Sequence, residues 1–217
     1  ERLSLIRQRD EEAEELEPGP AVVLHIIPNG TFSKSKVRST GKISDPSVLY
    51  ERHSYSETRG KSTIAYGNPL ESGKRSSYGL IRNDGLYETA SRSAIRTGTG
   101  GDLWIRGSIE STGMGLDTNV VLTTRDIVSK LAEMGFSGSA FVFLSFLDTS
   151  QVKLHRPDRN RGIRFSGPST FGSDFYTTEY GTVQIGSDAV ITDLEPVLSE
   201  IWRQFGQEDG TENIEDG

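Results

Sequence analysis

The 217-residue chain contains no cysteine, so disulfide bonds and thiolate metal sites are excluded. It also has no apolar run near the roughly 20 residues that span a bilayer. Its first residues, ERLSLIRQRD, lack the continuous apolar core of a signal peptide. These absences predict a cytoplasmic protein that makes no membrane contact.

Histidine is scarce, and His25, His53 and His155 lie far apart, without a metal-ligand spacing such as H-x3-H. There is no Ser-His-Asp elbow, HExxH motif or paired-carboxylate pattern. The Ser-Gly-Lys-Arg-Ser stretch at 72–76 is not a nucleotide P-loop, because the preceding Gly67 is one residue too distant and Arg75 takes the Ser/Thr position. We therefore predict no catalytic residues, metal or cofactor, and an enzyme is the weaker option.

Acidic residues are concentrated at the two ends of the chain. Residues 1–18 hold seven acids against three bases and residues 207–217 hold five acids against none, within a net charge of -7. Residues 34–106, in contrast, hold 13 bases against 7 acids. Either a mildly basic face or ordinary solvated surface is consistent with this distribution.

Charge and composition divide the chain into three parts. Residues 1–18 predict a short helix and a linker leaving an upstream domain that is missing, and Pro18, Gly19 and Pro20 end that helix. Residues 19–207 predict one domain. Residues 208–217 predict a disordered acidic tail.

Apolar runs predict the strands. Residues 21–27, AVVLHII, indicate a buried strand, in which His25 is either a hydrogen-bonded core side chain, the interpretation we favour, or a ligand. Residues 78–81 and 86–89 predict a hairpin around an Asp-Gly turn, followed by strands at 103–110 and 183–185. Residues 140–147 are the most apolar run and predict the central strand, with 151–155 paired to it. The polar stretch 29–76 predicts a long, loosely structured excursion.

Two amphipathic helices are predicted. The first spans 124–134, with Thr123 or Thr124 as its cap and Gly135 as its stop. The second spans 194–205, with Asp193 as its cap and Pro196 in its first turn. Together the elements predict a single α+β domain, in which a mixed or mostly antiparallel sheet of roughly five to seven strands is covered by these helices on one or both sides.

One dense basic cluster stands out, with Arg156, Arg159, Arg161 and Arg164 in a loop. Guanidinium groups grip phosphates through paired hydrogen bonds, so these four residues are the candidate nucleic-acid-binding residues. Aromatic residues at 165–180 follow. They either stack on bases or, as we favour, hold an irregular loop against the core.

Three stretches together carry a family resemblance: ERLSLIR followed by VVLHIIP, LIRNDGL followed by LWIRGSIE, and the closing LEPVLSEIWRQFG. Over nearly all of residues 1–207 the chain resembles the region that follows the Schlafen AlbA-type domain in microbial proteins described as DNA-binding or ATP-binding regulators. The resemblance implies that residues 1–9 are the exit helix of that AlbA-type domain. The family's nucleic-acid site belongs to the missing part. An Arg- and acid-rich, Lys-poor composition suits an archaeal source.

These observations predict a non-enzymatic accessory or sensing domain of a transcriptional regulator. It would contact its own upstream AlbA-type domain, a second copy of itself or an effector. The alternative is direct nucleic-acid binding through a basic loop surface.

Overall fold

The fold is organised around one antiparallel sheet. The computed structural model describes residues 2–8, 13, 15–32, 45–98, 100–106, 115–155, 157–158, 162–163 and 170–205. The strands of the main sheet are β1 (Ala21–Pro28), β2 (Tyr55–Arg59), β3 (Ser62–Tyr66), β4 (Ser77–Arg82), β5 (Tyr87–Ser91), β8 (Ser139–Leu147), β12 (Phe175–Thr177) and β13 (Gly181–Gln184). Their order is β12-β8-β1-β5-β4-β3-β2, with β13 also paired to β8. The predicted α+β class is confirmed, and the sheet has eight strands rather than five to seven.

Strand β8 lies inside the sheet, as its apolar run predicts. It pairs with β1 on one side and with β12 and β13 on the other, always antiparallel. Ala140, Val142, Leu144 and Phe146 are fully buried on one face. On the other face Phe141 and Phe143 are only half buried, so the cover on the two faces is unequal.

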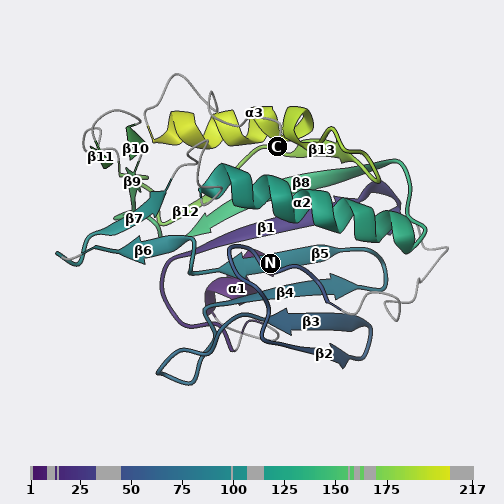
Figure 1. Cartoon of the computed structure of the whole chain (residues 1–217), viewed down its shortest axis with the longest axis horizontal. Coiled ribbons are helices and arrows are strands. Elements are labelled where there is room, and N and C mark those ends of the chain that lie inside the picture. The colour runs from purple at the N-terminus through teal and green to yellow at the C-terminus, as the bar shows by residue number, and fades with distance from the viewer. Residues whose placement is uncertain are drawn as a thin grey trace.

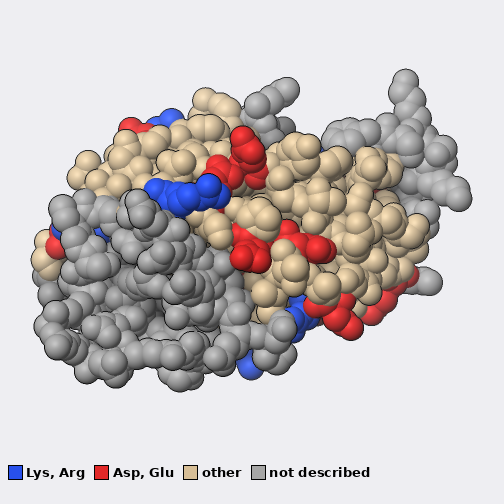
Figure 2. All heavy atoms as spheres, turned by 90° about the horizontal axis from the view of Figure 1, so that it is seen from above, with Lys and Arg blue, Asp and Glu red and all other residues tan. Residues whose placement is uncertain are grey.

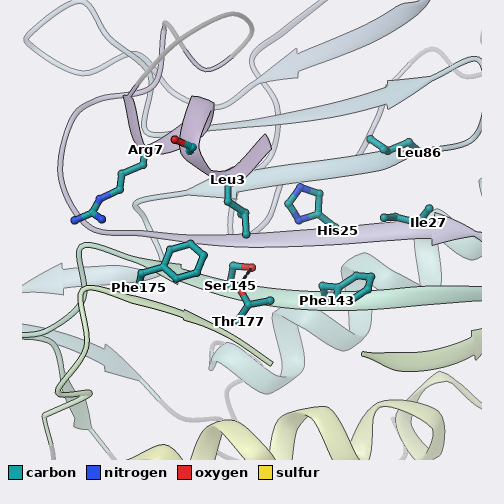
Figure 3. Close-up of a pocket in the computed structure, with 10 residues that line it drawn as sticks. Leu3, Arg7, His25, Ile27, Leu86, Phe143, Ser145, Phe175 and Thr177 are labelled. Carbon is teal, nitrogen blue, oxygen red and sulfur yellow. Dashed lines mark hydrogen bonds between the residues drawn. The ribbon is translucent and has the colours of Figure 1, made fainter. Parts of the chain in front are cut away.

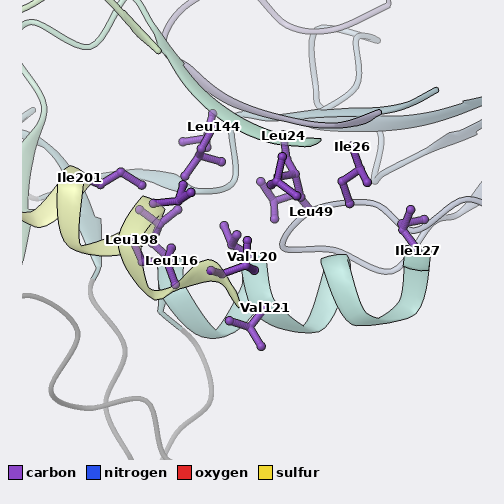
Figure 4. Close-up of a cluster of buried hydrophobic side chains, with 14 of the residues drawn as sticks. Leu24, Ile26, Leu49, Leu116, Val120, Val121, Ile127, Leu144, Leu198 and Ile201 are labelled. Atoms are coloured by element: carbon purple, nitrogen blue, oxygen red, sulfur yellow. The ribbon is translucent and has the colours of Figure 1, made fainter. Parts of the chain in front are cut away.

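Two helices, α2 (Leu116–Glu133) and α3 (Val190–Gln204), cover the same face of the sheet (Figure 1). Between them and the strands lies the larger core, which includes Leu24, Val120 and Leu198 (Figure 4). Gly135 ends α2 as predicted: its φ is 83°, and the Gly135 and Phe136 amides donate to the Ala132 and Leu131 carbonyls.

The predicted starts of both helices are wrong. Helix α2 begins at Leu116, so Thr123 and Thr124 lie inside it and are buried rather than capping. Helix α3 begins at Val190, so Asp193 is in its first turn and Pro196 lies in its interior. In both cases the buried apolar face, with Leu116 and Val190, extends further toward the N-terminus than the cap residues indicate.

The prediction of a loosely structured 29–76 segment is wrong for residues 55–66. They form the β2–β3 hairpin, which joins the sheet through β3 and β4. Ile64 and Tyr66 are buried on the face opposite α2 and α3, and this burial holds an otherwise polar hairpin in place. Residues 29–32 form a short 3-10 helix, η2 (Asn29–Phe32). The predicted 78–89 hairpin is confirmed as β4 and β5.

A smaller sheet contains β6 (Ile95–Thr97), β7 (Leu103–Arg106) and β9 (Lys153–His155). Residues 151–155 were predicted to pair with the central strand, which is wrong, because β9 pairs in parallel with β7. Two further short strands, β10 (Pro157–Asp158) and β11 (Gly162–Ile163), pair with each other.

Helix α1 (Arg2–Gln8) lies on the face of the sheet opposite α2 (Figure 1). Ile6 is fully buried, and with Ala13 and Leu16 it forms a second core against Val23, Ile64 and Tyr78. The predicted upstream domain stays a prediction, and the acidic tail at 208–217 lies outside the described residues. Among the helices that the structure describes, none is long and apolar enough to cross a membrane.

Candidate functional site

A pocket of about 480 Å³ opens between α1 and the face of the sheet that α2 and α3 leave uncovered. We call it the α1 pocket. Helix α1 contributes Leu3, Ser4 and Arg7. The sheet contributes His25 and Ile27 from β1, Phe143 and Ser145 from β8, and Phe175 and Thr177 from β12, and Leu86 precedes β5 (Figure 3).

Strand alternation explains why these residues meet. Successive side chains of a strand point to opposite faces, so Leu24 and Ile26 enter the larger core while His25 and Ile27 face α1. The registers place His25 opposite both Glu88 of β5 and Phe143 of β8. Residues more than 60 positions apart in the sequence therefore share one surface.

A buried polar chain forms one side of the pocket floor. His25 Nε2 lies 3.0 Å from Glu88 Oε2, and the Tyr78 hydroxyl donates to Glu88 Oε1 at 2.6 Å. Glu88 is 0% exposed and Tyr78 1%, whereas His25 retains 8% exposure at the pocket. The interpretation of His25 as a hydrogen-bonded core side chain is confirmed, and the residue also lines a cavity.

The remaining polar groups of the pocket are paired with each other or with its rim. The Ser145 and Thr177 hydroxyls lie 3.0 Å apart, and the Gln8 amide donates to Ser4 Oγ. Arg7 Nε donates to Asp148 Oδ1 at 2.8 Å, and this ion pair fastens α1 to the residue that follows β8.

The walls of the pocket are mostly apolar. Leu3, Ile27, Leu86, Phe143 and Phe175 line it, and Phe175 is 46% exposed. Beside the pocket, the Tyr180 ring meets Phe141 edge-on at 5.4 Å. The uncovered half of this sheet face is thus aromatic and partly open to solvent.

A second cavity, of about 450 Å³, lies between α2 and the segment 45–53. Its charged side chains Asp45, Glu51, Asp126 and Lys130 have local partners. Lys130 Nζ donates to the Asp45 carbonyl, Ser47 Oγ and Asp126 Oδ2, and Ser47 also donates to Asp126. Glu51 accepts hydrogen bonds from three serines and the Asn68 amide. These contacts anchor the segment to the fold and leave the α1 pocket as the better candidate site.

The titration behaviour of nearby tyrosines reflects burial. Burial raises the pKa of Tyr87 well above its ordinary value; its hydroxyl donates to the Ser47 carbonyl. Burial also raises the pKa of Tyr176, and the hydrogen bond from Tyr176 to Glu200 raises it further. Both side chains are neutral structural groups on the α2 and α3 side of the sheet.

No group of three or more histidine, aspartate or glutamate side chains in the described part of the chain is placed to hold a metal ion. The four predicted nucleic-acid-binding residues, Arg156, Arg159, Arg161 and Arg164, lie outside the described residues. Of the neighbouring aromatics, Phe171 packs against Phe146 and Phe205 in the core, as the favoured interpretation predicts. Tyr180 remains 62% exposed.

Sequence reasoning identified His25 but missed its partners. Glu88 lies 63 positions further along the chain, and a glutamate within a short hairpin strand gives no signal until the β1–β5 register is known. Comparison with known proteins adds nothing to this geometry: no protein-family model, curated protein or solved structure matches the chain.

Proposed function

We propose that this chain is a non-enzymatic sensing domain that binds a small effector in the α1 pocket. The observation that carries the proposal is the pocket itself, with apolar walls and one buried polar chain on its floor. Small-molecule sites in proteins typically measure about 300–1,000 Å³ and combine such walls with a few placed polar groups. The α1 pocket has that size and composition.

The cost of burying Glu88 supports a functional role. A carboxylate that is 0% exposed is costly to remove from water, and an apolar pair of similar shape often stabilises a fold equally well. Buried charged groups beside a cleft are for this reason candidates for binding or catalytic roles. Here the chain from Tyr78 through Glu88 ends at a histidine that reaches the pocket.

Helix α1 is the element through which ligand binding in the α1 pocket is transmitted to the rest of the protein. It forms the roof of the pocket and is held by buried Ile6 and by the Arg7–Asp148 ion pair. A ligand beneath Leu3 adds contacts that favour the docked helix. We place the domain in the cytoplasm, as part of a regulator whose AlbA-type domain precedes α1, with that domain or a second copy of the chain as partner.

The test is binding of 1-methoxynaphthalene, an apolar probe, followed by fluorescence and by hydrogen exchange of residues 2–8. We expect saturable binding at one site and slower exchange of the α1 amides when the probe is bound. The variant Ser4→Trp places a large ring at the pocket mouth and is expected to weaken binding at least tenfold.

The matched control is Gln8→Trp, which puts the same ring on an exposed position of the same helix outside the pocket lining. It is expected to bind the probe as the unmodified protein does. The proposed function is contradicted if the unmodified protein binds neither this probe nor 1-naphthol, the same ring system with a hydroxyl group. Equal loss of binding in both variants also contradicts it.

Direct nucleic-acid binding is the second proposal, carried by the four arginines of 156–164 in the sequence. Figure 2 offers it no support on the face it shows, where the described basic and acidic side chains lie close together. Four phosphate contacts predict that log affinity falls with log salt with a slope of roughly -3 to -4. Replacement of all four arginines by alanine is expected to flatten this slope, and salt-independent binding would exclude the proposal.

A further inference from the structure

We propose that the α1 pocket selects ligands that carry a hydrogen-bond donor, such as a phenol-type hydroxyl group, and that His25 Nδ1 accepts this hydrogen bond. The inference rests on the proposed function and names its ligand class: a small, mostly apolar molecule with one donor group. It is carried by the Tyr78–Glu88–His25 chain.

Glu88 determines which imidazole nitrogen holds the proton. Its Oε1 accepts from the Tyr78 hydroxyl and its Oε2 faces His25 Nε2, the arrangement expected of a carboxylate that accepts at both oxygens. His25 Nε2 is then the donor. The proposal takes His25 as the neutral imidazole, in which the other nitrogen, Nδ1, is the acceptor.

The position of Nδ1 follows from the sheet. The two ring nitrogens point to nearly opposite sides of an imidazole. Since Nε2 faces Glu88 on β5, Nδ1 faces the β8 side of β1, where Phe143 and Ser145 line the pocket. Figure 3 shows the His25 ring beside Leu3 at this surface. Within the described residues Nδ1 makes no hydrogen bond.

The other polar groups of the pocket are engaged. The Ser145 and Thr177 hydroxyls contact each other, and the guanidinium group of Arg7 contacts Asp148. Each of these groups already has one partner, whereas His25 Nδ1 has none among the described residues. An acceptor-only ligand would instead leave Nδ1 without a partner in an apolar site, which disfavours it.

Two probes of nearly equal shape separate the inference from the proposed function. 1-Naphthol has a hydroxyl donor, and 1-methoxynaphthalene has the same ring system without one. We expect the unmodified protein to bind 1-naphthol roughly tenfold more tightly, the effect of one well-placed hydrogen bond in a site shielded from water. Equal affinity, within twofold, overturns the inference and leaves the proposed function standing. Failure of both probes to bind overturns both.

Two variants test whether the position of the proton on the His25 imidazole determines the ligand preference. In Glu88→Gln the amide oxygen takes the Tyr78 hydrogen and the amide nitrogen donates to His25 Nε2, which moves the imidazole proton to Nδ1. The preference is then expected to reverse, favouring 1-acetylnaphthalene, an acceptor, over 1-naphthol. The double variant His25→Phe with Glu88→Gln leaves no carboxylate buried without its partner and is expected to lose both preferences.

A preference for 1-naphthol that persists in the folded Glu88→Gln variant, or in the folded double variant, overturns the inference. A purely structural role for Glu88 would lower the melting temperature without changing the order of the probes. The comparison of the two probes on the unmodified protein does not require either variant to fold.

Discussion

At the scale of single residues, the face of the sheet to which a side chain points decides what that side chain contacts. Leu24 and His25 are neighbours in β1, yet Leu24 packs under α2 and His25 joins a polar chain beneath α1. Tyr78 and Tyr87 differ in the same way, because Tyr78 contacts Glu88 and Tyr87 contacts the Ser47 carbonyl. Strand alternation, rather than residue type, assigns each side chain to core or pocket.

Trp202 is expected to be a main stabilising residue of the larger core. Its ring is 4% exposed, and its Nε1 donates to Asp117 Oδ1 of α2 at 2.9 Å. Trp202→Ala should lower the free energy of unfolding by about 3–5 kcal/mol, measured by denaturant titration. The control Leu122→Ala, at a side chain that is 51% exposed, should change it by less than about 0.5 kcal/mol. An unchanged midpoint for Trp202→Ala would refute its core position.

Tyr87 should make the fold sensitive to alkali. Its pKa is raised in the folded protein because burial disfavours the phenolate, so the folded state keeps a proton that the unfolded state releases above about pH 10. Its contribution to stability is complete below that pH and declines as the pH rises further. In Tyr87→Phe the slope of unfolding free energy against pH should be shallower by up to about 1.4 kcal/mol per pH unit. An identical slope above pH 10 would contradict this assignment.

At the scale of secondary structure, α1 is an integral part of the domain described here. A seven-residue helix is too short to be stable alone, so its packing must hold it. Ile6 and Leu3 supply the apolar contacts, and Arg7 supplies the ion pair to Asp148. The helix therefore combines two roles, covering the second core and roofing the α1 pocket.

Ile6→Ala should test the first role. The side chain is 0% exposed, so its truncation is expected to lower the free energy of unfolding by about 2–5 kcal/mol in denaturant titration. Ser4→Ala, two residues earlier at an exposed position of the same helix, is the control and should have little effect. Equal stability of the two variants would show that α1 is not packed as described.

Periodicity predicted the elements with strong apolar patterns, whereas capping rules misplaced the starts of both helices. Residues 140–147 and the faces of α2 and α3 were identified because burial there is continuous. Threonine favours the cap position, which is why the sequence predicts a cap at Thr123 or Thr124, but both side chains are buried within α2. The β2–β3 hairpin was missed because its Ser, Thr and Lys residues carry little apolar signal, and pairing with β4 stabilises it.

At the scale of the whole molecule, the two faces of the sheet are unequal. The face under α2 and α3 holds the larger core, and the face under α1 holds a smaller core, an aromatic surface and the α1 pocket. The sequence predicted the first face through its helices. It did not predict the second, because His25, Glu88 and Tyr78 come together only through the pairing of β1, β5 and β4.

The structure of the complex with 1-naphthol tests the central claim most directly. The account predicts the ring system between Leu3 and Phe143 in the α1 pocket, with its hydroxyl oxygen about 2.7–3.0 Å from His25 Nδ1 and the Glu88–His25 contact intact. Naphthol bound instead in the cavity beside Lys130, or seated in the α1 pocket with its hydroxyl group turned away from His25, would contradict it.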